Sequence, residues 1–293
     1  MRLWRKEAPV PRRPFAVDAV TSADGTTIGF RRYGTGPGLV LIHGGMNAAQ
    51  DLGDLASLLS DAFTVLVPDR RGRGMSGPFG PDHTIAKQVQ DLRAILDRTG
   101  ARFVFGLSAG GLVALEAAAE LAQITRLAVY EPPLTPSADG TSWDWLARFD
   151  KEIAAGKLGA ALVTAAVGTG DTSMIIRLPR LLTEPFLDFA ISAQARASKP
   201  GEAALKDLVL SMHDDAAMVR AKAGQLRSFG RVQAKVLLMS GRRSPPELRE
   251  PVRALGGIIA SSTVVELADA DHLAATNGER PRAVARELRP FFD

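Results

Sequence analysis

Short apolar runs alternate with longer alanine- and leucine-rich stretches along most of the chain, and this alternation constrains the fold more than any other feature. Glycine, proline or charged residues bound each apolar run. The runs that fit buried strands cover residues 38–43, 63–68, 102–107, 126–130, 234–239 and 263–267. The stretches that fit helices cover residues 48–60, 83–99, 109–122, 246–257 and 279–291. Such alternation predicts an α/β fold, in which helices cover both faces of a mainly parallel sheet.

The two ends of this pattern differ from its middle. Residues 15–33 read as two strands joined at Asp24-Gly25, a dipeptide suited to a tight hairpin turn. Residues 134–232 have no convincing strand pattern, and runs such as 145–162 and 202–229 carry apolar residues at helical spacing. An insertion of this kind would lie over the strand ends, where open α/β sheets bind ligands. The predicted organisation is a basic arm (1–14), an α/β core (15–133 and 233–293) and a helical cap insertion (134–232).

Composition and charge narrow the class of protein. The chain has 293 residues, of which 46% are hydrophobic, enough for one large domain that carries an insertion. Residues 1–14 hold five basic residues and one acidic residue, so their net charge of +4 equals that of the whole chain. The remaining residues are therefore balanced in charge, which argues against a nucleic-acid-binding surface. No cysteine is present, which excludes disulfides and thiol nucleophiles.

The N-terminal arm also bears on location. Its basic start is followed by a polar, proline-rich stretch at residues 8–14 instead of the apolar segment of a signal peptide. No stretch of the chain approaches the roughly 18–20 apolar residues of a membrane span. We therefore expect a cytoplasmic protein with no membrane partner. The sequence does not indicate an oligomeric state.

A candidate nucleophile stands between a predicted strand and a predicted helix. The segment Gly106-Leu107-Ser108-Ala109-Gly110 follows the strand at 102–107 and opens the helix at 109–122. A nucleophilic serine needs a turn this sharp to project its Oγ, and the small residues around it let the backbones pack closely. The alternative is a glycine-rich turn or a phosphate loop, although the GxxxxGK[ST] string of phosphate loops is absent. Ser108 is thus the predicted nucleophile.

A serine hydroxyl needs a base, and the chain offers four histidines. His272 follows the last predicted strand and precedes the last predicted helix, which makes it the candidate base. Its alternative interpretation is a solvated loop histidine. We expect His43 to be a hydrogen-bonded structural residue. His83 is expected to mark a helix start, and His213 to lie on the surface of the insertion.

Backbone N–H groups are expected to bind the oxyanion that forms during attack on a carbonyl. The glycines after the first buried strand, in His43-Gly44-Gly45-Met46, would let a backbone N–H approach it. Gly45 or Met46 is therefore one predicted donor, and Ala109, directly after the serine, is the other.

Several motifs together resemble the α/β-hydrolase superfamily, in particular its serine esterase and lactonase-like branch. They lie between residues 39 and 133 and read HGG (43–45), PDRRGRGMSG (68–77), GLSAGG (106–111) and YEPP (130–133). The resemblance implies a triad in the chain order serine, acid, histidine, and it implies no particular substrate because this scaffold hosts many reactions. It also implies that the residues of the second motif that match D-x-R-G-x-G-x-S brace a loop instead of reacting. These are Asp69, Arg70, Arg71 and Ser76.

The acid of the triad departs from the commonest pattern of the family. Relatives usually carry an aspartate three or four residues past the glycine that ends the penultimate strand, but residues 239–246 read MSGRRSPP and hold no carboxylate. Some relatives carry the acid one strand earlier, and Glu131 stands there. Glu131 is therefore the predicted acid, with Asp215, Asp269 and Asp271 as alternatives.

These residues predict hydrolysis of a small-molecule carboxylic ester or lactone through an acyl-enzyme, without cofactor or metal. Carbon–carbon bond hydrolysis, acyl transfer and cyclisation use the same serine chemistry and stay open. A non-catalytic, hydrolase-like ligand-binding protein is the alternative of another class, since the usual aspartate is missing. Apolar residues of the insertion are expected to form helix core, and some of them to line a pocket: Trp143, Trp145, Phe149, Met174, Phe186, Phe189 and Met212.

Overall fold

The computed structural model of the chain describes residues 7–135, 143–169 and 179–293. Met174 and the first six residues of the basic arm, both considered in the sequence analysis, lie outside these ranges. The described part of the arm runs along the surface of the core. The Arg12 guanidinium pairs with Asp54 at 3.3 Å, and Glu7 accepts the Arg282 N–H at 3.1 Å.

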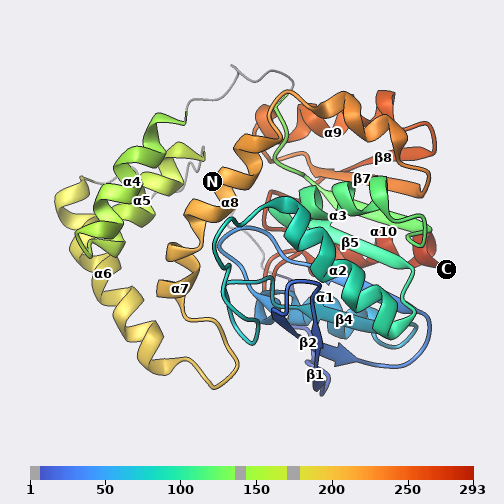
Figure 1. Cartoon of the computed structure of the whole chain (residues 1–293), viewed down its shortest axis with the longest axis horizontal. Coiled ribbons are helices and arrows are strands. Elements are labelled where there is room, and N and C mark those ends of the chain that lie inside the picture. Colours follow the sequence, from blue (N-terminus) through green and yellow to red (C-terminus); the bar gives the residue numbers. More distant parts are fainter. Residues whose placement is uncertain (1–6, 136–142, 170–178) are drawn as a thin grey trace.

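The described residues form one eight-stranded sheet in the order β1-β2-β4-β3-β5-β6-β7-β8 (Figure 1). The strands are β1 (Ala16–Thr21), β2 (Thr27–Tyr33), β3 (Gly38–Ile42), β4 (Thr64–Pro68), β5 (Phe103–Leu107), β6 (Arg126–Tyr130), β7 (Lys235–Gly241) and β8 (Ser262–Leu267). The pairs β1–β2 and β2–β4 are antiparallel, and all the other pairs are parallel. Gly25 has a φ of +84° in the turn between β1 and β2, which suits the expected Asp24-Gly25 hairpin. The predicted strands are confirmed to within two residues.

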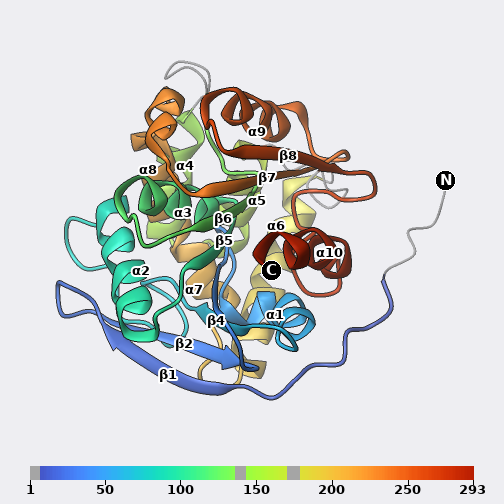
Figure 2. The same cartoon turned by 90° about the vertical axis from the view of Figure 1, so that its right-hand side faces the viewer.

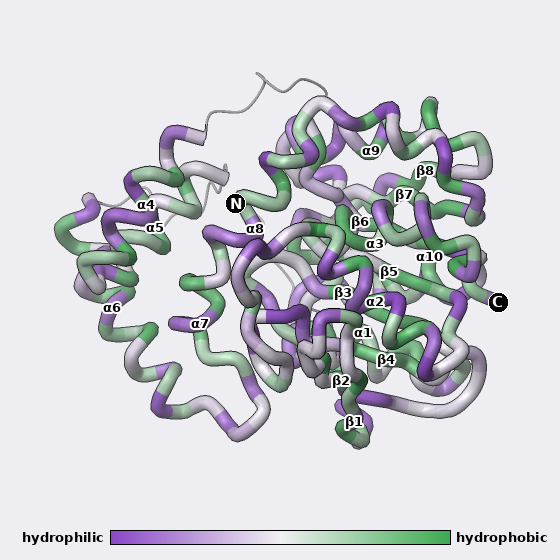
Figure 3. Tube along the Cα trace, in the orientation of Figure 1, coloured by the Kyte–Doolittle hydropathy of each residue, from purple (hydrophilic) through white to green (hydrophobic). Residues whose placement is uncertain are grey.

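Helices cover both faces of this sheet, as Figure 2 shows. One face packs against α2 (Ile85–Thr99), α3 (Ala109–Glu120) and α9 (Pro246–Ile258), and the other against α1 (Gly53–Leu59) and α10 (Pro281–Phe292). Successive side chains of a strand point to opposite faces, so Val40 belongs to the first core and Leu39 to the second. Strands that are buried on both faces must be apolar throughout, which explains the continuous apolar runs of the sequence. Figure 3 shows this concentration of hydrophobic residues along β5, β6 and α3.

Between β6 and β7, the described residues form helices and the loops that join them, with no strand among them. It forms α4 (Asp144–Ala154), α5 (Leu158–Gly168), α6 (Arg180–Ala197), α7 (Leu205–Leu210), α8 (Met212–Ala221) and the 3-10 helix η3 (Leu226–Arg231). The run 145–162 is split into α4 and α5 at Gly156, whose φ of +71° ends the first helix. Helices α4 to α7 lie to the left of the sheet in Figure 1, whereas η3 packs against α3 and α9 in the core.

Within the described ranges, no helix is both long and apolar enough to cross a membrane. The expected cytoplasmic location stays a prediction.

Candidate active site

Ser108 occupies the turn between β5 and α3. Its backbone has a φ of 51° and a ψ of −122°, and its N–H donates to the Tyr130 carbonyl at 2.8 Å. A Cβ on Gly106 or on Gly110 would collide with neighbouring carbonyl groups, those of Gly110 and His43 respectively. Glycine at both positions therefore permits the sharp strand-to-helix turn that projects the serine side chain.

His272 lies in the loop between β8 and α10, and its ring reaches the serine. The distance between His272 Nε2 and Ser108 Oγ is 3.1 Å. The start of this loop is held by the Tyr130 hydroxyl, which donates to the Asp271 carbonyl at 2.7 Å. His272 is therefore fixed at hydrogen-bonding distance from Ser108 and is no freely solvated loop histidine.

Glu131 completes the line from the other side of the imidazole. Its Oε2 is 2.8 Å from His272 Nδ1, and its Oε1 accepts the Gly241 N–H at 2.7 Å. The residue is fully buried at the end of β6 and has a φ of 45°, in the left-handed region that non-glycine residues rarely adopt. Both carboxylate oxygens thus have partners, and one of them faces the histidine.

The three alternative acids lie elsewhere in the hydrogen-bond network. Asp215 is buried between Arg70 and Arg73. Asp269 is exposed and pairs with Arg243 at 3.0 Å. Asp271 accepts the N–H of Leu273, the second residue after it. Of these four carboxylates, Glu131 is the one that the structure places in hydrogen-bonding contact with the His272 ring.

The loop after β3 lies against the serine. A Cβ on Gly44 would come within 3.1 Å of the Ser108 Cβ, so only a side chain as small as hydrogen fits there without a shift. Met46 has a φ of 55° in the same loop, and Ala109 begins α3, where the first N–H groups of a helix have no partner within it. The roles of Gly45, Met46 and Ala109 as oxyanion donors stay predictions.

His43 is held between two backbone groups. It is fully buried, its Nδ1 is 2.9 Å from the Gly44 carbonyl, and its Nε2 accepts the Arg70 N–H at 3.0 Å. Burial and the nearby arginines hold the pKa of His43 well below its usual value, so the ring is neutral with its proton on Nδ1. The structural interpretation of His43 is confirmed by these bonds.

The other two histidines have partners other than Ser108 and Glu131. His83 precedes α2, its ring packs against Phe79, and its Nε2 is 3.0 Å from the Gln88 amide. Burial lowers the pKa of His83 to about 4. His213 lies on α8, where its Nδ1 is 2.8 Å from Asp150 at the surface.

The loop after β4 is braced as the resemblance implied. Asp69 accepts the N–H groups of Ala49 and Met75, and the Ser76 hydroxyl donates to the Asp69 carbonyl. The fully buried Arg71 side chain donates both Nε and Nη2 to Asp91. A second pair, between Arg71 and Asp24 at 2.8 Å, connects the loop to the β1–β2 turn.

Two residues with structural influence on the site were missed by the sequence analysis. Tyr130 anchors the loop of His272 through its hydroxyl, and Arg73 donates to the Asn47 carbonyl beside the candidate oxyanion donors. The contacts themselves could not be predicted locally, because each joins residues far apart in sequence. The position of Tyr130 directly before Glu131 was the one available indication.

The apolar residues of the helical segment divide into two groups. Phe149 is buried in a cluster that Trp143, Trp145 and Met212 flank, and Met46 of the loop after β3 packs against the same cluster. Phe186 and Phe189 are exposed on α6. The first group therefore extends from the helical segment to the candidate oxyanion loop.

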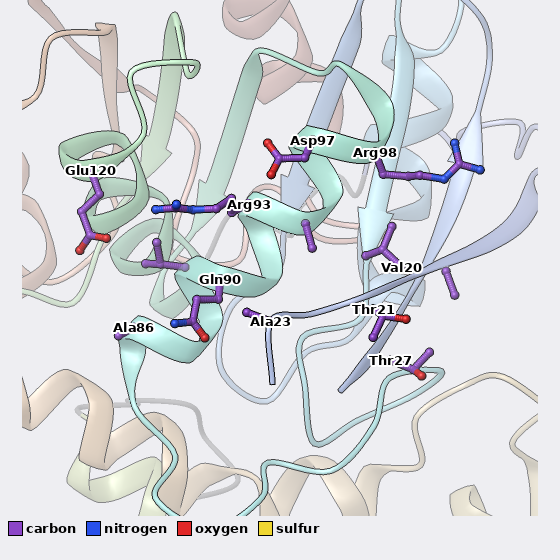
Figure 4. A pocket seen from close by; sticks show the side chains of 13 residues that line it. Val20, Thr21, Ala23, Thr27, Ala86, Gln90, Arg93, Asp97, Arg98 and Glu120 are labelled. Atoms are coloured by element: carbon purple, nitrogen blue, oxygen red, sulfur yellow. The ribbon is translucent and has the colours of Figure 1, made fainter. Parts of the chain in front are cut away.

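A groove of about 930 Å³ lies elsewhere on the molecule, between the β1–β2 hairpin and α2 (Figure 4). Its walls carry Val20, Val89, Arg93 and Arg98 and none of the residues at the Ser108 site. The groove and the candidate active site are thus separate features.

Residues 39–287 match the model of the alpha/beta hydrolase family. The chain belongs to this family. The fold is the α/β-hydrolase fold. A solved alpha/beta hydrolase from Sphaerobacter thermophilus is similar to this chain over nearly its whole length. That structure superposes with a TM-score of 0.74 and 31% identity, covering 94% of this chain and 100% of the other.

Two further similar proteins are a lactonase and a haloperoxidase. The enol-lactonase from Burkholderia xenovorans has a TM-score of 0.62 and 27% identity over 95% of this chain and 99% of its own. A non-heme haloperoxidase from Rhodococcus erythropolis is 33% identical over 95 residues, which is 31% of this chain. The matched segment spans 35% of that haloperoxidase. Three relatives from Mycobacterium bovis and Mycobacterium tuberculosis are 34% identical over 98 residues, which is 28% of their length. These similarities support a hydrolase without specifying its class.

Proposed function

We propose that this α/β hydrolase cleaves a carboxylic ester or lactone through an acyl-enzyme on Ser108. The observation that carries the proposal is the continuous line of hydrogen-bonding distances from Ser108 Oγ through the His272 ring to the Glu131 carboxylate. A nucleophile and base in contact, with the base oriented by a third group, is the arrangement that activates a serine hydroxyl.

The reaction follows from these positions. His272 Nε2 takes the Ser108 hydroxyl proton as Oγ forms a bond to the substrate carbonyl carbon. The carbonyl oxygen becomes an oxyanion, which N–H groups of Ala109 and of Gly45 or Met46 bind. The imidazolium then returns its proton to the leaving alkoxide as the carbon–oxygen bond breaks. In the second half, water attacks the acyl carbon as His272 Nε2 takes its proton. The imidazolium then gives this proton to Ser108 Oγ as the acyl carbon–Oγ bond breaks and the carboxylic acid leaves.

Glu131 acts through the histidine. Its carboxylate holds the proton of His272 on Nδ1, which leaves Nε2 free to accept the serine proton, and it stabilises the imidazolium that forms. The bond from the Gly241 N–H to the other carboxylate oxygen fixes the orientation of Glu131. This chemistry needs no cofactor.

The helical segment over 134–232 would serve as the cap of the substrate site. The contact of Met46 with the apolar cluster of that segment supports this role, because it brings cap side chains to the candidate oxyanion loop. An apolar pocket wall beside a serine suits a small-molecule acyl substrate. The similarity to an enol-lactonase supports lactones as a substrate class to test beside esters.

A fluorophosphonate probe tests the proposal. It should label the wild-type protein and leave Ser108→Ala unlabelled, with both proteins folded by circular dichroism. A panel of p-nitrophenyl esters of increasing acyl length, together with several lactones, then measures which class is turned over. Absence of labelling and of turnover in the wild type would favour a ligand-binding protein. Labelling without turnover of this panel would favour carbon–carbon hydrolysis or acyl transfer.

A further inference from the structure

Three buried charges lie beside the candidate oxyanion loop, which comprises residues 44–47. Arg70 and Arg73 come from the loop after β4, and Asp215 comes from α8 of the helical segment. Their exposed fractions are 5%, 2% and 2%. Neither Arg73 nor Asp215 belongs to the proposed relay. These buried charges therefore need a role other than proton transfer.

Each arginine connects Asp215 to a carbonyl of the oxyanion loop. Arg70 donates from Nη2 to Asp215 Oδ1 at 2.6 Å and from Nη1 to the Gly44 carbonyl at 3.3 Å. Arg73 donates from Nη2 to Asp215 Oδ2 at 3.1 Å and from Nη1 to the Asn47 carbonyl at 3.2 Å. The two braced carbonyls therefore flank Gly45 and Met46.

Asp215 also lies against the loop itself. A Cβ on Gly45 would come within 3.3 Å of Asp215 Oδ2, which places the carboxylate next to the Gly45 backbone. Met46 adopts its left-handed conformation in this same loop, and such a conformation persists only where its surroundings hold it. The carboxylate and the two guanidinium groups are the surroundings on this side.

The cluster depends on its single acid. Two guanidinium groups that are removed from water repel each other unless a carboxylate lies between them, and breaking a buried ion pair is strongly destabilising to the local arrangement. Without the Asp215 charge, the arginines would move apart or toward solvent. Their hydrogen bonds to Gly44 and Asn47 would move with them.

We propose that Asp215 is a positioning residue: through Arg70 and Arg73, it sets the backbone of residues 44–47 in the geometry that binds the oxyanion. The inference rests on the proposed serine hydrolase function. It makes docking of α8 a condition for a complete oxyanion site, so the helical segment contributes to the rate as well as to substrate binding.

The direction in which kcat changes on loss of Asp215 distinguishes a positioning role from a purely electrostatic one. If the cluster acted only through its charge, loss of the negative Asp215 would favour the developing oxyanion and raise kcat. If Asp215 positions the loop, its loss lowers kcat and leaves KM nearly unchanged, because the misplaced donors act on the transition state more than on the bound ester.

The test compares Asp215→Asn with Asp214→Asn, the same change one residue away on α8. A double variant, Arg73→Met with Asp215→Asn, removes one charge of each sign and so preserves the net charge of the cluster. We expect kcat on p-nitrophenyl acetate to fall about 10- to 100-fold in both variants that lack Asp215, below the loss of 10²–10³ typical of deleting an oxyanion donor. KM should change by less than about 3-fold, and the Asp214→Asn values should match wild type.

Amide hydrogen exchange measures the loop without a substrate. The amides of residues 44–47 should exchange faster in Asp215→Asn than in wild type, while those of α3 stay unchanged as an internal reference. Unchanged or raised kcat, or unchanged exchange in the loop, would overturn the inference. A wild type that neither labels nor hydrolyses would refute the proposed function, and the exchange comparison would still decide whether Asp215 holds the loop.

Discussion

The ends of β6 and β7 lie side by side, with Tyr130 paired to Met239, yet they carry opposite charges. The end of β6 holds the buried Glu131. The end of β7 leads into Arg242 and Arg243 at the place where relatives usually carry the acid. The backbone of the β7 end still takes part, because the Gly241 N–H binds Glu131. The comparison teaches that the proposed relay takes its carboxylate from the end of β6, while the neighbouring end of β7 contributes a backbone N–H that holds this carboxylate.

The largest effect is expected from removing the acid at β6. Glu131→Gln keeps the size of the side chain but loses the negative charge opposite His272 Nδ1. We expect kcat to fall by about 10³–10⁴-fold, by analogy with triads whose acid is neutralised. Steady-state kinetics on the best ester of the panel measures this, with Asp269→Asn as the control for loss of an acid near the same loop. Activity close to that of wild type would remove Glu131 from the proposed relay.

A second carboxylate placed after β7 should recover part of that loss. Ser244 is buried three residues after Gly241, the last residue of β7, and its hydroxyl has no hydrogen-bond partner among the described residues. In the double variant Glu131→Gln and Ser244→Asp, we expect kcat to rise about 10-fold above that of Glu131→Gln alone. The same kinetics, with Ser244→Asn in the Glu131→Gln background as control, tests this. Equal rates for the Asp and Asn versions would show that the end of β7 cannot supply the acid in this chain.

The smallest effect concerns Tyr130, whose hydroxyl connects the end of β6 to the loop of His272. Tyr130→Phe deletes the bond to the Asp271 carbonyl and should lower the free energy of unfolding by about 1 kcal/mol. The loop keeps its other contacts, so kcat should fall by less than about 10-fold. Urea unfolding and kinetics on one preparation measure both. A loss of kcat as large as that of Glu131→Gln would mean that Tyr130 contributes more than anchoring.

The sequence predicted the sheet well because strands buried on both faces must be continuously apolar. The turn at Ser108 was predictable for a similar local reason, since strand, serine and glycines are contiguous. Glu131 was predicted from the family resemblance, because some relatives carry the acid at this strand end and residues 239–246 contain no carboxylate. The three side chains do lie within hydrogen-bonding distance, and their catalytic roles stay predictions.

Contacts between distant segments were beyond prediction. Asp215 and Arg70 are 145 residues apart, and no periodicity connects a helix of the insertion to a loop of the core. Gly156 could be seen as a residue that tolerates a helix end, but apolar spacing continues on both sides of it, so the break between α4 and α5 was not evident. The left-handed backbone at Met46 and Glu131 had no signal either, because glycine or asparagine normally marks such positions.

The conformation of Glu131 has a consequence for engineering. A buried carboxylate on a left-handed backbone costs on the order of 1–3 kcal/mol for the conformation alone, which glycine would not incur. Glu131→Gly would remove this cost, but it would also leave the buried Gly241 N–H and the His272 ring without their partner, which offsets the gain in stability. Directed evolution of this scaffold toward thermostability would need a simultaneous screen for activity, because relief of strain at residue 131 would remove the proposed acid.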